Sequence, residues 1–539
     1  MLASNFMKEL LWWHTGIIYQ IYPRSFKDSN DDGIGDLQGI ISRLGYLKQL
    51  GVEVLWLSPI YPSPMADFGY DISDYQDIDP LFGTLDDFDR LVDAVHQLGM
   101  KLVLDLVPNH TSDQHPWFLE SRSSRNNPKR NWYIWQDPAS NGGLPNNWLS
   151  VFGGSGWAWD ERTGQYYYHG FLKEQPDLNW RHPEVQQAMF GVMRFWLDKG
   201  VDGFRVDVMW HMIKDLQLRD NPVNEHYQPF MPTYDQLLPV YSTEQPEVHE
   251  IVRKMRAVLD EYEERMMIGE IYLPLDQLMA YYGNAGDEVQ LPFNFQLLSL
   301  PWDAGVIAAA IEAYEAALPF EGWPNWVLGN HDRPRITSRV GLEQARVAAM
   351  LLLTLRGTLT IYYGDEIGMR DVPIPFDEIL DPQGLNMPDK NLSRDPCRTP
   401  MQWDSTTGAG FTLSKPWLRL DKSSPRENVE LQQHDPYSML SLYKRLISLR
   451  KRELSLHAGE YLPVFSDSQV LAFIRHAVGK ARFLVVLNLR HGPCYFRPQH
   501  FRFEGAIELG TDPCLDGKRV KDGINLSGDE GVIIRLDIE

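Results

Sequence analysis

Short apolar runs rich in β-branched residues alternate with longer amphipathic stretches along most of this chain. Parallel β/α units produce this alternation, because each buried strand is followed by a helix that covers the sheet. The strand candidates are residues 16–23, 52–59, 101–108, 203–208, 266–271, 289–295, 325–330 and 358–364. The pattern predicts an α/β protein built on a (β/α)8 TIM barrel, whose functional side chains lie just beyond the carboxyl ends of the strands.

Two regions depart from this alternation. Residues 109–180 show no long helical pattern, and within them residues 157–171 read as two aromatic strands around a Thr-Gly turn. From residue 456 onward, short alternating runs predict an antiparallel β domain. The predicted divisions are a first part of the catalytic barrel at 1–108, an inserted subdomain B at 109–180, the second part of the barrel at 181–455 and a C-terminal β domain at 456–539.

Composition limits the partners and the cellular location that this protein can have. The formal net charge of -22 would repel a phosphate backbone, so nucleic acid is excluded. No apolar run is long enough to cross a bilayer. Three cysteines fit neither a disulfide framework nor a zinc cluster, and the N-terminus lacks the pattern of a signal peptide, which together predict a cytoplasmic protein. The sequence does not indicate an oligomeric state.

Ionisable residues stand at the ends of four strand candidates. They are Asp105, Asp207, Glu270 and Asp332, with His110 and Arg205 close by in sequence. Cleavage of a glycosidic bond needs one carboxylate to attack the anomeric carbon, a second to protonate the departing oxygen, and fixed negative charge to meet the developing positive charge. Converging carboxylates on a barrel therefore indicate a glycosidase acting on a small-molecule saccharide.

These motifs resemble the α-amylase family of glycoside hydrolases. The resemblance rests on Asp105, Asn109 and His110, on GFRVD at 203–207, on Glu270, and on Asn330, His331 and Asp332. Two further stretches, QPDLN at 175–179 and RTPMQW at 398–403, are similar to the α-glucosidase and oligo-1,6-glucosidase branch of that family. The resemblance extends over nearly the whole chain.

The resemblance implies a role for each matching residue. Asp207 is expected to be the nucleophile, Glu270 the general acid/base and Asp332 the transition-state stabiliser. The residues expected to bind substrate are Asp67, Tyr70, His110, Phe171, Arg205, His331 and Arg398. Asp67 and Arg398 match the pair that holds the terminal glucose in exo-acting members, and Arg205 is expected to keep Asp207 ionised. We expect Phe171 to line the site and Phe152 to pack in the core.

An early loop, DSNDDGIGD at 28–36, places oxygen-bearing residues at alternate positions around a glycine. The resemblance implies a structural Ca²⁺ or Mg²⁺ ion at this loop. Its expected ligands are Asp28, Asn30, Asp32, the Ile34 carbonyl and Asp36. The distal Glu of an EF-hand is missing, which favours a structural role over sensing.

Taken together, these features predict a retaining, exo-acting α-glucosidase that hydrolyses short α-glucosides from the non-reducing end through a covalent glucosyl-enzyme. An α-glucosyl transferase or an isomerase of the trehalose synthase or sucrose isomerase type would use the same three carboxylates. A non-catalytic relative, like the heavy chains of amino-acid transporters, would lose the carboxylates that this chain keeps. Val208 resembles the residue found in members acting on α-1,6 bonds, but one side chain leaves linkage preference open.

More local explanations remain for single residues. A carboxylate at a strand end can cap a helix, a lone histidine can simply fill the core, and an Asp/Asn-rich turn can form without a metal ion.

Overall fold

The computed structural model describes residues 10–498 and 500–537. The first nine residues, which form part of the segment that we inspected for a signal peptide, lie outside the described residues. The outer ends of the first and last predicted domains lie outside them as well.

Eight parallel strands form the centre of the molecule, in the order β10-β11-β1-β2-β3-β7-β8-β9. Their bounds are β1 Ile17–Ile21, β2 Val54–Leu57, β3 Lys101–Leu106, β7 Gly203–Val206, β8 Met266–Gly269, β9 Leu291–Pro292, β10 Asn325–Val327 and β11 Thr358–Tyr362. The sheet closes where the backbone N–H of Asn294 donates to the Asn325 carbonyl (3.0 Å). The predicted barrel is therefore confirmed.

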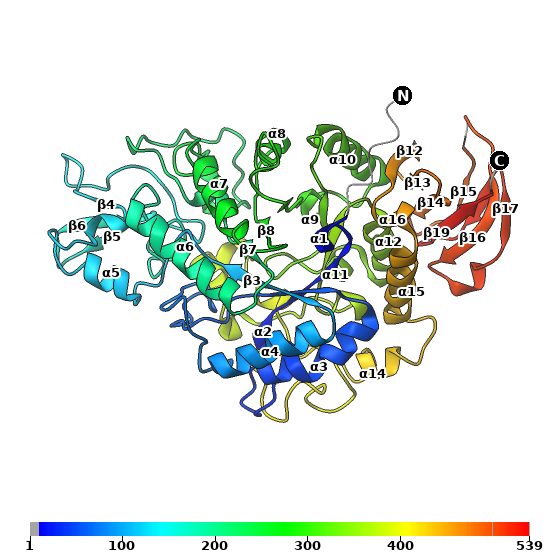
Figure 1. The fold of residues 1–539 in the computed structure, drawn as a ribbon, viewed down its shortest axis with the longest axis horizontal. Coiled ribbons are helices and arrows are strands. Elements are labelled where there is room, and N and C mark those ends of the chain that lie inside the picture. Colours follow the sequence, from blue (N-terminus) through cyan, green and yellow to red (C-terminus); the bar gives the residue numbers. More distant parts are fainter. Residues whose placement is uncertain (1–9, 499, 538–539) are drawn as a thin grey trace.

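Helices cover the outside of the barrel (Figure 1). The principal ones are α3 Leu37–Leu50, α4 Leu85–Gln97, α6 Pro183–Asp198, α7 Val248–Leu259, α8 Leu275–Ala280, α10 Ala304–Ala317, α12 Leu342–Thr354 and α15 Met439–Arg452. Local sequence sets where they begin: the Asp36 carboxylate caps α3 through the Gly39 N–H, and Thr84 and Asp87 form a capping box on α4.

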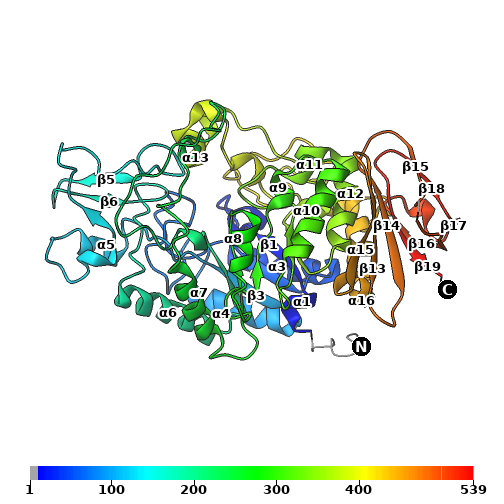
Figure 2. The ribbon, with the colours of Figure 1, turned by 90° about the horizontal axis from the view of Figure 1, so that it is seen from above.

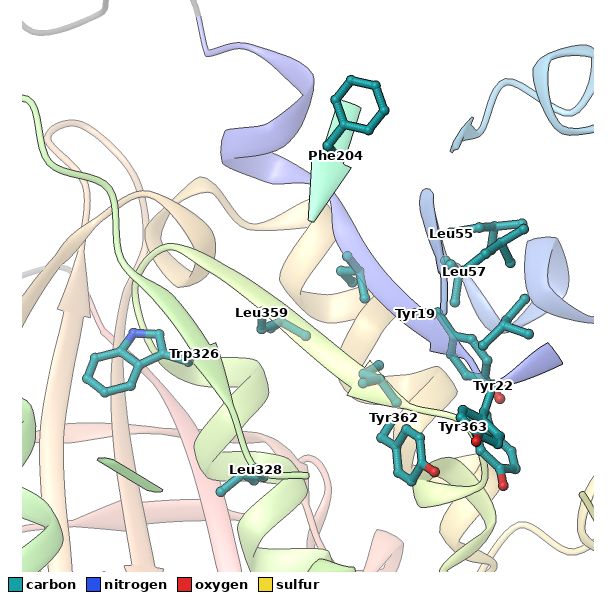
Figure 3. Close-up of a cluster of buried hydrophobic side chains, with 14 of the residues drawn as sticks. Tyr19, Tyr22, Leu55, Leu57, Phe204, Trp326, Leu328, Leu359, Tyr362 and Tyr363 are labelled. Carbon is teal, nitrogen blue, oxygen red and sulfur yellow. The ribbon is translucent and has the colours of Figure 1, made fainter. Parts of the chain in front are cut away.

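The barrel core is made of apolar and aromatic side chains from neighbouring strands. Figure 3 shows part of it, with Tyr19 of β1 beside Leu55 and Leu57 of β2, and Leu359 and Tyr362 of β11 nearby. These strands are buried along their whole length, as expected for parallel strands covered by helices. Such packing holds the strand ends, and the side chains on them, in fixed positions.

The insertion after β3 carries a small three-stranded sheet at one end of the molecule (Figures 1 and 2). It is built from β4 Trp135–Gln136, β5 Trp157–Asp160 and β6 Gln165–Tyr168, with α5 Pro116–Ser121 beside it. The buried Lys214 ammonium joins the insertion to the barrel by pairing with Asp177 and donating to Oδ1 of Asn109 (2.7 Å). The two aromatic strands predicted from the sequence are β5 and β6.

A six-stranded antiparallel sheet lies at the opposite end, in the order β12-β13-β14-β19-β16-β17 (Figure 2). Its strands are β12 Glu460–Ser466, β13 Val470–His476, β14 Arg482–Asn488, β16 Glu504–Gly510, β17 Arg519–Lys521 and β19 Gly531–Leu536. A two-stranded ribbon, β15 Cys494–Phe496 with β18 Ile524–Leu526, packs beside it. The predicted C-terminal β domain is confirmed.

Among the described residues, no helix has the length and apolar character needed to span a membrane.

Candidate active site

One guanidinium gathers three carboxylates at the carboxyl ends of β3, β7 and β8. Nη1 of Arg205 lies 2.7 Å from an oxygen of Asp105 and 2.7 Å from Oδ1 of Asp207, and its Nη2 lies 2.6 Å from Oε2 of Glu270. We call Arg205 and these three carboxylates the strand-end cluster. It brings together residues far apart in sequence, as the barrel geometry predicts.

The backbone beyond β7 is shaped to hold Glu270. Val208 has φ of 36° and ψ of 46°, a left-handed conformation that is strained for a β-branched residue. Its N–H consequently donates to Oε2 of Glu270 (3.0 Å), the same oxygen that Arg205 contacts. The residue that follows Asp207 therefore positions Glu270 with its backbone.

Burial and charge oppose each other at Asp207. Burial raises the pKa of its carboxyl group, and the Arg205 guanidinium pulls it back down. The neighbouring charges of Glu270 and Asp105 raise it again. Arg205 thus favours the ionised form of Asp207, as expected from the sequence, against a strong desolvation effect.

A second guanidinium, on the loop after β11, binds a different set of carboxylates. Nη2 of Arg394 lies 2.7 Å from Asp67 and 2.6 Å from Asp381, while its Nη1 lies 3.3 Å from Oδ1 of Asp332. Arg398 contacts the same Asp332 oxygen at 3.0 Å. We call these five residues the loop cluster.

Asp332 is more open to solvent than the other two candidate catalytic carboxylates. Its side chain is 23% exposed, compared with 9% for Asp207 and 4% for Glu270. Although burial alone would raise the pKa of Asp332, His331 and the two loop-cluster arginines hold it well below its usual range. Asp332 therefore supplies fixed negative charge next to the opening of the site.

His331 and Tyr70 connect the two clusters. Their rings stack at 5.4 Å with an interplanar angle of 3°, and the Tyr70 hydroxyl lies 2.8 Å from Nε2 of His331 and 3.0 Å from Oδ2 of Asp105. An amide N–H of Gln20 donates to Nδ1 of His331 (2.7 Å), which leaves the ring proton on Nε2. Burial lowers the pKa of His331 well below its usual range, so the ring is neutral.

His110 and Phe171 form the wall contributed by the insertion. The Nε2 atom of His110 lies 3.1 Å from the Gln175 amide, which also donates to Oδ2 of Asp67 (3.2 Å). Burial lowers the pKa of His110 to about 4. Phe171 is partly exposed, contacts His110 at 5.2 Å between ring centroids, and packs edge-on against the buried Phe152.

The contacts described above bring the predicted substrate-binding residues together, but sequence reasoning did not single out two residues of the loop cluster. Arg394 and Asp381 lie at the centre of the loop cluster, and Asp67 bonds Arg394. Arg394 stands four residues before Arg398 in SRDPCRTP. This closeness in sequence to a predicted substrate-binding residue was the signal that could have identified Arg394. Phe152, predicted to pack, does so beneath the Arg394 guanidinium at 4.9 Å.

The loop at residues 28–36 is held by its own donors. The two carboxylate oxygens of Asp28 accept four hydrogen bonds, which come from the N–H groups of Asn30, Asp31 and Gly33 and from the Thr412 hydroxyl. These contacts occupy the acceptor positions of that carboxylate. Asp36 likewise caps α3 and accepts from Ser29.

The ligand chemistry of this loop still suits a hard cation, because Asn30, Asp32 and the Ile34 carbonyl offer only oxygen atoms. The Asn30 and Asp32 side chains each accept one backbone N–H and keep free acceptor capacity. Among the described residues, no three His, Cys, Asp or Glu side chains converge on one metal position. Metal binding would therefore require the loop carboxylates to turn toward a common centre.

Comparison with known proteins identifies the family of this chain. The model of the alpha amylase catalytic domain matches residues 20–459. A "Probable alpha-glucosidase" of Rhizobium meliloti (strain 1021) is 43% identical over 479 residues, which cover 86% of this chain and 87% of that protein. An "Oligo-1,6-glucosidase" of Parageobacillus thermoglucosidasius is 40% identical over 535 residues, covering 92% and 94%.

Among solved structures, an "alpha-glucosyl transfer enzyme, XgtA" superposes with a TM-score of 0.92 at 40% identity. The match covers 98% of this chain and all of that one. Family and fold thus agree, and the chain belongs to the α-amylase family of glycoside hydrolases.

Proposed function

We propose that this enzyme is a retaining, exo-acting α-glucosidase that releases glucose from the non-reducing end of short α-glucosides. The observation that carries the proposal is the strand-end cluster, in which Asp207 and Glu270 bond to the same Arg205 guanidinium. Two carboxyl groups held by one guanidinium stand close together, and a close pair is the arrangement that retaining glycosidases use.

The reaction would proceed in two displacements. An oxygen of Asp207 attacks the anomeric carbon while the bond to the leaving oxygen breaks and Glu270 transfers its proton to that oxygen. Asp332 would stabilise the positive charge on the sugar ring. Water then attacks the anomeric carbon, Glu270 takes the water proton, and the Asp207 carboxylate leaves with net retention.

The loop cluster supports exo action. Arg394 links Asp67, Asp381 and Asp332, and we infer that these bonded groups close the end of the site that receives the terminal glucose. Carboxylates and guanidinium groups fixed in this way can accept and donate hydrogen bonds to the hydroxyls of one terminal glucose. A closed end leaves no room for a chain that continues past that glucose.

The proposal is tested by chromatography of early products from maltose, isomaltose, sucrose and trehalose, each incubated separately with the enzyme. Free glucose as the main early product supports hydrolysis, and the order of rates reports linkage preference. An Asp207→Asn variant serves as the matched control. Hydrolysis that survives in this variant would remove the nucleophile assignment.

Glucosyl transfer is the second candidate, because the chain is 40% identical to a structure described as an α-glucosyl transfer enzyme. Transfer differs only in the second step, where a hydroxyl of another molecule replaces water. A rearranged disaccharide or a longer saccharide among the early products would assign this function instead.

We also propose that Ca²⁺ or Mg²⁺ binds the loop at residues 28–36 as a structural ion. The support is its oxygen-only ligand set, Asp28, Asn30, Asp32, the Ile34 carbonyl and Asp36. Added Ca²⁺ or Mg²⁺ should raise the melting temperature of EDTA-treated protein, and Asp32→Asn should abolish the increase. An equal melting temperature with and without either ion would reject the site.

A further inference from the structure

An unpaired guanidinium stands directly beside the catalytic carboxylates. Arg333 follows Asp332 in sequence, is exposed, and lies over the ring of Tyr272 at 5.4 Å. It forms no ion pair with any residue that the structure describes. The other arginines of this region, Arg205, Arg394 and Arg398, all contact carboxylates.

The position of Arg333 places it on the leaving-group side of the pocket. Tyr272 lies two residues after Glu270. Burial lowers the pKa of Arg333, while the neighbouring Tyr272, Asp332 and Glu270 raise it. Under the proposed mechanism Glu270 protonates the leaving oxygen, so the leaving group must lie beside Glu270. Arg394 bonds Asp67 and Asp381 and reaches Asp332, the residue before Arg333, with its other nitrogen.

Two loops complete this side of the pocket. The segment between β7 and α7 meets the loop after β11 near α13 Pro382–Asn386 (Figure 2). From the first segment, the Tyr227 hydroxyl lies 3.5 Å from the Lys390 ammonium, and the Thr233 hydroxyl donates to Met387 (3.4 Å). Asp235 belongs to the first loop. Burial raises the pKa of Asp235 and the charge of Arg333 lowers it.

Two of the acidic groups near Arg333, Glu270 and Asp332, already have other cationic partners, whereas Asp235 forms no ion pair with a described residue. Glu270 is bonded to Arg205, and Asp332 to Arg394 and Arg398. Arg333 forms a hydrogen bond with the Tyr272 side chain, and it contacts no carboxylate among the described residues. A guanidinium has five N–H donors, and a carboxylate can accept two parallel hydrogen bonds from those that remain.

Building on the proposed α-glucosidase activity, we propose that Arg333 is a specificity-determining residue that selects α-glucosides whose leaving group carries a carboxylate. The glucose end of the pocket, which is lined by Asp67, Asp207 and Asp381, would repel an anion. Arg333 supplies positive charge where the variable part of the substrate must lie. The selected substrates are therefore glucosides of hydroxy acids and phenolic acids.

The test compares two substrates of nearly equal shape, para-carboxyphenyl and para-carbamoylphenyl α-glucoside, which differ in charge. For each enzyme we would measure kcat/KM for both and take the ratio of the charged to the neutral substrate. Arg333→Gln should reduce this ratio about tenfold, because a charge-assisted pair is lost, while kcat/KM for the neutral substrate changes little. Arg333→Lys should reduce it less, since the charge remains.

Arg162→Gln is the matched control, because it removes an exposed arginine on the turn between β5 and β6 and should leave the ratio unchanged. An equal ratio in the unaltered enzyme and in Arg333→Gln would overturn the inference. Equal loss of activity on both substrates would also overturn it, because Arg333 would then only support Tyr272. If the unaltered enzyme cleaved neither glucoside nor any of the four disaccharides, the proposed function itself would fail.

Discussion

Arg205 and Arg394 each bind three carboxylates, but they stand on different parts of the fold. Arg205 lies on β7 and contacts side chains at the ends of neighbouring strands, whereas Arg394 lies on the loop after β11 and contacts Asp67, Asp332 and Asp381 from three separate loops. Under the proposed function, the strands fix the groups that make and break bonds, and the loops fix the shape that decides which end of a saccharide can enter.

The two clusters also differ in how they are supported. The side chain of Arg205 is 1% exposed and its partners are set by strand register, where Asp105 pairs with Arg205 across β3 and β7. Arg394 is 9% exposed and rests on Phe152 of the insertion. Disturbing the first cluster should therefore affect chemistry and folding, and disturbing the second should chiefly affect binding.

The largest effect is expected at Asp207. Replacing Asp207 with Asn removes the nucleophile and should lower kcat for α-glucoside hydrolysis by at least about 10⁴-fold. Steady-state kinetics on the best of the four disaccharides measure it, with circular dichroism as the control for folding. Activity within tenfold of the unaltered enzyme would mean that the strand-end cluster is not catalytic.

Replacing Arg205 with Met should damage both stability and activity. The variant leaves Asp105, Asp207 and Glu270 buried without their shared cation, so the free energy of unfolding should fall by about 3–5 kcal/mol. Denaturant unfolding checks this value. A variant as stable as the unaltered protein would show that the three carboxylates do not depend on Arg205.

Replacing Arg394 with Met sharpens the comparison. Because we expect this guanidinium to hold the groups that bind the terminal glucose, KM for short glucosides should rise about tenfold to a hundredfold, and kcat should fall less than in the Arg205 variant. Equal losses of kcat in the two variants would remove the distinction between chemistry on strands and binding on loops.

A smaller effect concerns pH. Burial lowers the pKa of His110 to about 4, so the unfolded chain binds more protons than the folded one between about pH 6.5 and pH 4. The contribution of His110 is fully present above the unfolded pKa, and stability is lost as pH falls through that window. His110→Gln should make the decline of the unfolding free energy with falling pH shallower, as measured by denaturant unfolding at several pH values. An unchanged slope would contradict the claim that the buried His110 ring is neutral.

Much of this architecture could be predicted from the sequence. The buried runs at β3, β7 and β8 are short and mostly apolar, and the motifs at their ends single out Asp105, Asp207 and Glu270 as candidates without coordinates. Periodicity reports local structure well because it reflects which side of a strand or helix is buried.

The loop cluster was harder to predict for a physical reason. Asp67, Asp381 and Arg394 lie in segments without periodicity, and their contacts depend on how two long loops, after β2 and after β11, fold over the barrel. The strained backbone at Val208, which aims an N–H at Glu270, also has no sequence signature. Arg333 carries no signal at all until its lack of a carboxylate partner is visible in three dimensions.

The central claim is that Asp207 forms a covalent bond to glucose, and trapping that intermediate tests it most directly. The enzyme would be treated with a fluorinated α-glucosyl fluoride that loses its glucosyl group slowly, then digested and examined by mass spectrometry. The account predicts one modified peptide, with the fluoroglucosyl group on the Asp207 carboxylate. An unmodified Asp207, or a label on another carboxylate, would contradict it.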